Sequence, residues 1–210
     1  MTGTTDTNWA AHNTEVADVW MSYRDGRPKR PPVIFDLPAI YTLSHPEINP
    51  TGMGFDEYIL DPDKQIKHQL QAQRWLRYQP RRDSLMGPDS GPLQLIVDDQ
   101  NFYEASWLGC PVEFRPSQPP YAAPLLAEHP EKLYDLSFPD PCGGMMARSL
   151  EYFEFMHEWA EGAEYDGFTV APPTRIKGLG SDGIFTLACE MRGAVNVCTE
   201  IGRASCRERV

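Results

Sequence analysis

Paired cysteines and metal-ligand spacings are missing from this sequence. Four of its five cysteines, Cys110, Cys142, Cys189 and Cys198, lie far apart and form no C-x-x-C motif. Neither a disulfide framework nor a zinc knuckle is therefore indicated, and the thiols are best interpreted as small buried side chains. The histidines also lack the spacing of a ligand set. We expect no metal to be bound by the residues present in this chain.

Basic residues and long apolar runs are scarce as well. The chain has 19 Lys and Arg against 30 Asp and Glu, a net charge of −11 at pH 7. Because phosphate backbones are bound by clustered cations, we expect no nucleic acid partner. The N-terminus MTGTTDTNWAAH has neither the basic n-region nor the apolar h-region of a secretion signal. No run of about 18 apolar residues, which a membrane-spanning helix would need, occurs in the chain. We therefore expect a cytoplasmic protein that does not contact membranes.

The last ten residues, IGRASCRERV, resemble a translated sequencing adapter. Back-translated with permitted codons they read atc gga aga gcg tcg tgt agg gaa aga gtg, which resembles the read-through of a widely used library adapter. The three arginines would otherwise indicate a basic tail, but the run of matching codons favours the adapter. We therefore expect residues 201–210 to be foreign to the protein, and residues 1–200 to be the N-terminal part of one larger domain.

Hydrophobic periodicity and capping residues predict two helices in the N-terminal half. Apolar residues recur at helical spacing over residues 8–25, and Gly26 ends the pattern. A second helix is expected over residues 61–78, where Asp61 is typical of an N-cap and Pro62 of the first turn. Both helices should turn an apolar side towards a core.

Two further helices are expected over residues 148–161 and 185–198. Residues that share the apolar side of the first of these are Leu150, Phe153, His157 and Ala160, with Phe155, Met156 and Trp159 nearby. Residues that share its opposite side are Glu151, Glu154, Glu158 and Glu161. We interpret the acidic side as solvated surface and the histidine as a core residue.

Short apolar runs predict buried strands over residues 31–37, 93–99 and 168–171. They alternate with the predicted helices and are apolar on both faces, which is typical of a parallel α/β sheet. The charged stretch at residues 81–83, Arg-Arg-Asp, is interpreted as a solvated loop.

Two features could carry chemistry. Gly178, Gly180 and Gly183 fit G-x-G-x-x-G, a dinucleotide fingerprint, but a proline-rich segment separates them from the preceding strand. A plain glycine loop is therefore favoured, and a nucleotide-dependent oxidoreductase is kept as a third class. Asp98 and Asp99 end an apolar strand, where a carboxylate can orient a substrate, accept a proton or bind a ring N–H. Capping of the next helix is an equal alternative for one of them.

Two segments resemble motifs of the uroporphyrinogen decarboxylase superfamily. GSDGIFTLACEMRG, residues 180–193, is similar to its G-x-P-x-T-L…G segment. IVDDQNFYEASWLGCPVEF, residues 96–114, is similar to its hydrophobic strand, catalytic aspartate and following L-G-x-x-V. The opening NWAAHNTEV and the segment PPVIF are also similar, so the resemblance spans nearly all of residues 8–200. It implies a (β/α)8 TIM barrel, of which this α/β chain holds about the N-terminal half.

The resemblance also assigns site residues. Asp99 matches the catalytic aspartate better than Asp98, because its distance to the L-G pair is nearer to the family spacing. The other matching segment contributes the expected substrate- or cofactor-binding residues, which are Gly180, Asp182, Gly183 and Thr186.

The superfamily contains tetrapyrrole decarboxylases and zinc-dependent methyltransferases that move methyl groups between a corrinoid and a thiol. The decarboxylases carry R-Q-A-G-R after the first strand, because a substrate with many carboxylates needs fixed guanidinium groups. This chain has no arginine between Arg30 and Arg74, and Cys189 or Glu190 replaces a family tyrosine. We therefore favour the methyltransferase branch and keep uroporphyrinogen III decarboxylase, an enzyme of porphyrin metabolism, as the alternative.

The favoured branch implies cofactors and partners for the complete protein. In that branch a His-x-Cys…Cys set near the end of the barrel binds zinc, which holds the thiol as a thiolate. These positions would follow residue 200, so zinc and a corrinoid are expected for the complete protein and not on the residues present here. The expected substrate is a small molecule or a corrinoid protein, and a homodimer is left open. A non-catalytic tetrapyrrole- or corrinoid-binding domain is the competing class.

Overall fold

The computed structural model describes residues 7–99, 103–115, 118–140, 142–177 and 183–207. The chain divides into two compact units. Unit 1 comprises Met1–Met53, Ile66–Leu95 and Ala160–Ala171, and unit 2 comprises Gly54–Gln65, Ile96–Trp159 and Pro172–Val210. Among the described residues, no helix has the length and apolar character needed to cross a bilayer.

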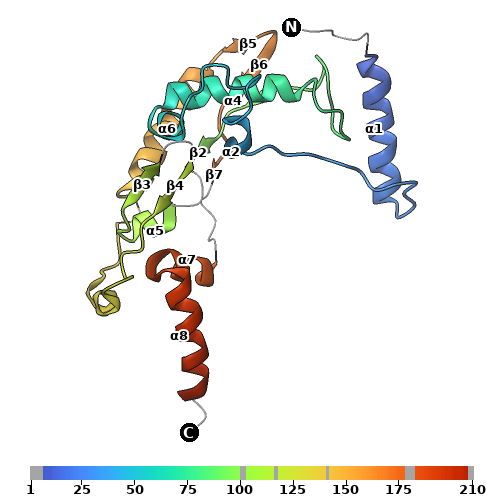
Figure 1. Ribbon diagram of the computed structural model, residues 1–210. Helices are drawn as coiled ribbons and strands as arrows, with labels where there is room; N and C mark the ends of the chain where they lie inside the picture. The colour runs from blue at the N-terminus through green and yellow to red at the C-terminus, as the bar shows by residue number, and fades with distance from the viewer. Residues whose placement is uncertain (1–6, 100–102, 116–117, 141, 178–182, 208–210) are drawn as a thin grey trace. The chain divides into compact units, whose positions relative to one another are not determined.

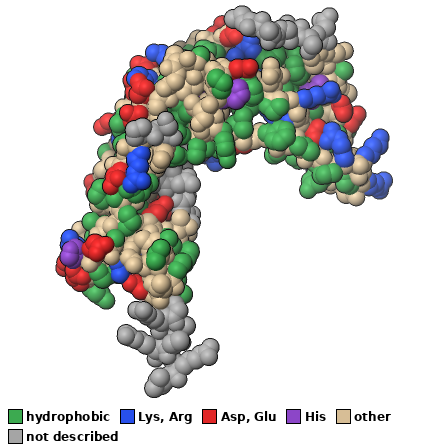
Figure 2. Space-filling model, in the orientation of Figure 1, with side chains coloured by type: hydrophobic (Ala, Val, Ile, Leu, Met, Phe, Trp, Pro, Cys, Tyr) green, Lys and Arg blue, Asp and Glu red, His purple; other side chains and the backbone are tan. Residues whose placement is uncertain are grey.

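Unit 1 begins with helix α1, Trp9–Arg24, which confirms the helix predicted over residues 8–25. The Asn8 side chain caps it by accepting a backbone N–H of the first turn at 3.0 Å. Its predicted apolar side is only partly covered, since Val16 is buried whereas Tyr23 is exposed. Figure 2 shows Lys and Arg side chains gathered over the C-terminal end of α1 and the turn that follows.

Helix α2 spans Ala39–Thr42, and α4 spans Pro62–Leu76. The start of α4 is as predicted, because an Asp61 carboxylate oxygen accepts a backbone N–H of the first turn at 3.2 Å. Ile66 and Leu70, one turn apart on the predicted apolar face, are both fully buried. The N-cap and the hydrophobic spacing therefore agree with the observed helix.

The strand predicted over residues 31–37 is wrong. The segment forms no strand, and its apolar side chains are exposed, Val33 to 47%. Pro31 and Pro32 have no N–H to give to a sheet ladder. The Val33 N–H donates instead to a carboxylate oxygen of Asp83 at 2.6 Å. A side chain thus takes the place that a neighbouring strand would have filled.

Asp83 is the anchor of this segment. Arg30 donates to both of its carboxylate oxygens, at 2.5 and 2.7 Å. The Arg30 guanidinium and the Val33 N–H hold the pKa of Asp83 down at about 2. Arg81 is exposed, but the Asp83 side chain is buried, so the expectation of a solvated loop is wrong for this residue. The pairing partner lies 53 residues away, which sequence spacing does not reveal.

Replacing Asp83 by Asn is expected to destabilise unit 1 at neutral pH. Because the folded pKa lies below the ordinary value, the stabilisation is present above about pH 4 and is lost as the pH falls towards about 2. The urea midpoint of Asp83→Asn should therefore lie below that of the wild type at about pH 7 and match it at about pH 2. Asp18→Asn, on the exposed side of α1, is the control and should leave the midpoint unchanged. A difference in urea midpoint between the wild type and Asp83→Asn that stays constant with pH would refute the stabilising role of the Asp83 carboxylate.

A small sheet completes unit 1. Strand β1, Leu93–Gln94, pairs in parallel with β6, Phe168–Ala171, where a strand was predicted. Strand β5, Glu164–Tyr165, pairs antiparallel with β6. Asp166 and Gly167 join them with φ of 50° and 82°. Two positive φ values match the twist of a two-residue hairpin, and Asp-Gly is the pair that adopts them most readily.

Unit 2 contains a second parallel pair, β2, Val97–Asp98, beside β7, Ile176–Lys177 (Figure 1). The antiparallel hairpin of β3, Val112–Arg115, and β4, Gln118–Ala122, was not predicted. Strands β1 and β2 lie within the predicted strand 93–99. The two parallel pairs agree with an α/β arrangement, and the described strands form sheets of three, two and two strands. A barrel stays a prediction.

The remaining helices are α3, Phe55–Leu60, α5, Tyr103–Trp107, the 3-10 helix η1, Pro130–Asp135, and α6, Met145–Ala160. The acidic side predicted for α6 is exposed, as expected. Its apolar side was placed only partly correctly. Ala160 is buried as predicted, and so are Ser149, Tyr152 and Met156, whereas Leu150 and His157 are exposed. The His157 Nε2 donates to the carbonyl of Pro173 at 2.8 Å, so this ring is not a core residue.

The helix predicted over residues 185–198 is divided into α7, Ile184–Arg192, and α8, Ala194–Arg207. Gly193 separates them with a φ of 88°, which an L side chain rarely adopts. Of the cysteines, Cys110 is buried as predicted, whereas Cys142 is exposed.

Candidate functional site

The carboxyl end of β2 holds two buried aspartates, Asp98 and Asp99, which are 2% and 1% exposed. The Tyr58 hydroxyl of α3 donates to an Asp98 carboxylate oxygen at 3.1 Å. The Gln65 amide bonds to the Asp98 backbone on both sides, accepting its N–H at 2.8 Å and donating to its carbonyl at 3.1 Å. One glutamine at the start of α4 thus replaces a neighbouring strand at the end of β2.

Asp99 is held by helix α6. The Arg148 guanidinium donates to one Asp99 carboxylate oxygen at 3.1 Å, and the Ser149 hydroxyl donates to the other. Burial raises the pKa of Asp99, although Ser149 and Arg148 oppose this by favouring the charged form. The two carboxylates therefore have different surroundings, a hydroxyl for Asp98 and a cation with a hydroxyl for Asp99.

Arg148 is the part of this cluster that reaches solvent. Its side chain is 21% exposed, whereas Asp99 beside it is almost fully buried. Its Nε is buried and makes no hydrogen bond among the described residues. Through its exposed part this guanidinium can hold an anionic group next to a carboxylate of raised pKa that can accept a proton. We call these six residues, Tyr58, Gln65, Asp98, Asp99, Arg148 and Ser149, the strand-end cluster.

Of the other predicted site residues, the structure describes Gly183 and Thr186, which are not members of this cluster. Gly180 and Asp182 lie outside the described residues, so their prediction stays untested. Gly183 precedes α7 with a φ of 92°, and the Thr186 side chain is exposed on that helix. The strand-end cluster is built instead from β2, α3, α4 and α6. The geometry of the strand-end cluster therefore does not support the binding role expected for Gly183 and Thr186.

Four members of the strand-end cluster were missed by the sequence reasoning. Tyr58 lies 40 residues before Asp98, and Ser149 lies 50 residues after Asp99. Arg148 and Ser149 lie in a helix that was predicted, but neither residue was assigned to its buried side. The one available signal was that a polar serine precedes Tyr152 and Met156 at spacings of three and seven, which is typical of one helix face.

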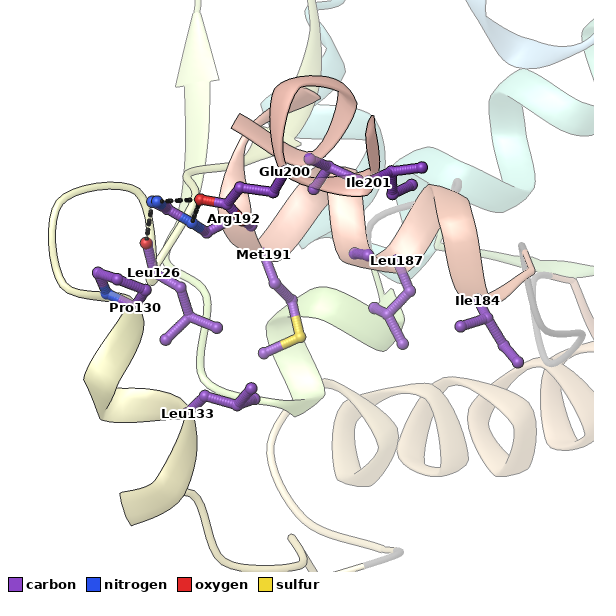
Figure 3. Close-up of a pocket in the computed structure, with 11 residues that line it drawn as sticks. Leu126, Pro130, Leu133, Ile184, Leu187, Met191, Arg192, Glu200 and Ile201 are labelled. Carbon is purple, nitrogen blue, oxygen red and sulfur yellow. Dashed lines mark hydrogen bonds and ion pairs between the residues drawn. The ribbon is translucent and has the colours of Figure 1, made fainter. Parts of the chain in front are cut away.

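A second candidate in unit 2 is an apolar cavity of about 510 Å3. Figure 3 shows the Leu126, Leu133 and Met191 side chains pointing towards one another inside it. The charged residues of its lining, Arg192 and Glu200, pair with each other at 2.7 Å. Their pairing leaves apolar contact as the main interaction that the cavity offers to a small molecule.

Metal ligands do not gather in the described residues. There, no three His, Cys, Asp or Glu side chains lie close enough together to hold a metal ion. The described residues do not fit a zinc ion, and we assign zinc no ligand and no role among them.

Comparison with known proteins gives no match: no protein-family model, curated protein or solved structure is significantly similar to the chain. The strand-end cluster is therefore interpreted from its own chemistry, together with the motif resemblance of residues 96–114 and 180–193.

Proposed function

We propose that the chain belongs to an enzyme of the uroporphyrinogen decarboxylase superfamily, of the corrinoid-dependent methyltransferase type, with a cytoplasmic location. The observation that carries the proposal is the position of Asp99. It is a buried carboxylate of raised pKa at the carboxyl end of a parallel strand, the edge at which α/β enzymes build their active sites.

Two further features support the choice of branch. Between Arg30 and Arg74 the chain offers no arginine to bind the many carboxylates of a uroporphyrinogen. In the strand-end cluster, Arg148 provides one guanidinium, which suits a substrate with a single anionic group better than one with many. We infer a methyl acceptor that is a thiol bearing one anionic group.

The residues of the cluster then have separate tasks in the proposed reaction. Arg148 binds the anionic group of the thiol and so orients its sulfur. Asp99 accepts the proton that the thiol loses, while the methyl carbon passes from the corrinoid substrate to sulfur and the bonding electron pair stays with the corrinoid. Asp98, bonded to Tyr58 and carrying the Gln65 contacts, fixes the end of the strand and does not contact the substrate.

The purified product of the source gene, amplified across codon 200, is expected to demethylate a methylcorrinoid when an anionic thiol is supplied. Product formation is measured by mass spectrometry of the methylated thiol. The same protein should leave uroporphyrinogen III unchanged, because the arginine clamp is absent. A neutral thiol of equal size is the control, and its KM should be about tenfold higher, since it cannot use Arg148.

Release of carbon dioxide from uroporphyrinogen III, without methyl transfer, would reject the methyltransferase and favour the decarboxylase. The decarboxylase remains the second candidate because of the partly exposed guanidinium of Arg148 beside Asp99. This guanidinium could also bind a carboxylate of a uroporphyrinogen. Binding of a tetrapyrrole without turnover would favour the non-catalytic class, for which the apolar cavity in unit 2 is the supporting observation. Ile201 forms part of that cavity and belongs to the segment expected to be adapter-derived, so the cavity does not carry the proposal.

A further inference from the structure

Unit 1 contains a polar hollow that the proposed reaction does not use. Its volume is about 400 Å3, and its lining consists of His12, Glu15, Arg30, Val33, Arg81, Arg82 and Asp83. It lies beside the Arg30–Asp83 pair that anchors Val33 and its neighbours. Helix α1 and the segment 81–83 meet here through Trp20, whose Nε1 donates to the carbonyl of Asp83 at 2.8 Å.

The hollow is cationic in a chain that is strongly acidic. It contains three guanidinium groups and two carboxylates, whereas the whole chain carries a net charge of −11. Arg30 is engaged by Asp83 through two hydrogen bonds. Glu15 lies 3.1 Å from Arg81, so one positive charge remains in excess on the side of Arg81 and Arg82, and it creates a local potential that attracts an anion.

Arg82 is held in a fixed position with donors unused. Its Nε donates to the Ser84 hydroxyl at 2.7 Å, and one terminal nitrogen donates to the carbonyl of Leu76 at 2.6 Å. The other terminal nitrogen has no hydrogen bond to the described residues. Burial lowers the pKa of Arg82, and a bound anion would offset this loss of hydration. Arg81, whose side chain is 66% exposed, pairs with Glu15 at 3.1 Å and keeps most of its donors in solvent.

Glu15 adds an acceptor to these donors. Its side chain is 57% exposed, and its carboxylate lies 3.1 Å from Arg81. His12 also belongs to the lining, but its ring is almost enclosed, since the residue is 4% exposed and its Nε2 donates to the carbonyl of Ser84 at 3.2 Å. A ligand that carries a hydroxyl can donate it to the Glu15 carboxylate.

We propose that the hollow is a binding site for a phosphoryl group. A phosphoryl group carries anionic oxygens for Arg81 and Arg82, and in its singly protonated form it also carries a hydroxyl that the Glu15 carboxylate can accept. Sulfate has the same tetrahedral shape but carries no hydrogen, so it presents only oxygens to the carboxylates of Glu15 and Asp83. The mixture of donors and acceptors in the lining thus selects phosphate over sulfate.

The test is calorimetric titration of the full chain with inorganic phosphate at about pH 6, with sulfate and phenyl phosphate in parallel. Phosphate should bind, and sulfate should bind at least about tenfold more weakly. Arg81→Gln should weaken phosphate binding about tenfold, whereas Arg27→Gln, an exposed arginine outside the hollow, should change it less than about twofold. Equal affinity of phosphate and phenyl phosphate identifies the free ion as the ligand, and tighter binding of phenyl phosphate identifies a monoester.

Arg82→Lys provides a second variant, because it keeps the charge and loses the planar fork. It should also weaken phosphate binding, at unchanged circular dichroism. The proposal is overturned if phosphate gives no heat up to about 10 mM, if sulfate binds equally well, or if Arg27→Gln weakens binding as much as Arg81→Gln. The titration measures no methyl transfer, so its outcome is independent of the proposed reaction.

Discussion

Arg148→Met should destabilise the protein by about 3 kcal/mol at pH 7, one of the two largest effects that we expect. The substitution leaves Asp99, which is 1% exposed, with the Ser149 hydroxyl but without its cation. An isolated buried carboxylate costs more than the pair contributed, because its desolvation is no longer offset. The free energy of unfolding from urea titration measures the loss.

Two controls separate the ion pair from general damage to α6. Glu151→Gln, at an exposed position on the same helix, should change the free energy of unfolding by less than about 0.5 kcal/mol. In an Asp99→Asn background, Arg148→Met should lower the free energy of unfolding much less than in the wild type, which a double-mutant cycle detects. Equal costs in both backgrounds would contradict the described pair.

The effect of Arg148→Met should also depend on pH. Burial raises the pKa of Asp99, and removing Arg148 raises it further, so the loss of unfolding free energy should shrink as the pH is lowered from about 7 to about 4.

Asp99→Asn should lower kcat for methyl transfer by about 100-fold or more, because the amide cannot accept the proton of the thiol. Asp98→Asn should lower it less than about tenfold. The amide oxygen introduced by Asp98→Asn still accepts a hydrogen bond from the Tyr58 hydroxyl, and the Gln65 contacts are made with the backbone. Steady-state kinetics of both variants measure the difference. Similar losses in the two variants would remove the site assignment and leave the family proposal standing.

Local signals predicted the two long helices α1 and α4 well, whereas the short helix α2 was not predicted. Asn8 and Asp61 act as N-caps, and Ile66 with Leu70 gives the buried face of α4, since each signal depends only on residues within a few positions along the chain. The strand over residues 31–37 was predicted from hydrophobicity alone. It failed because a strand needs a partner for its N–H groups, and two prolines leave too few of them.

Long-range polar pairing accounts for most of what the sequence did not reveal. Asp83 was expected in solvent, but its side chain is buried and accepts hydrogen bonds from Arg30. The buried side of α6 was predicted only in part, since Ser149 faces inward to bond to Asp99, which a count of apolar residues does not detect. The end of the second strand with its two aspartates was predicted because the apolar run and the carboxylates adjoin in sequence. The groups that give these carboxylates different surroundings come from α3, α4 and α6.

The pH dependence of kcat for methyl transfer tests most directly whether Asp99 is the proton acceptor. In the wild type the rate should fall at low pH with an apparent pKa above the ordinary carboxyl value of about 3.9, because burial raises the pKa of Asp99. This acid limb should persist in Asp98→Asn and be absent from the residual activity of Asp99→Asn. An acid limb that is retained in Asp99→Asn, or lost only in Asp98→Asn, would contradict the account.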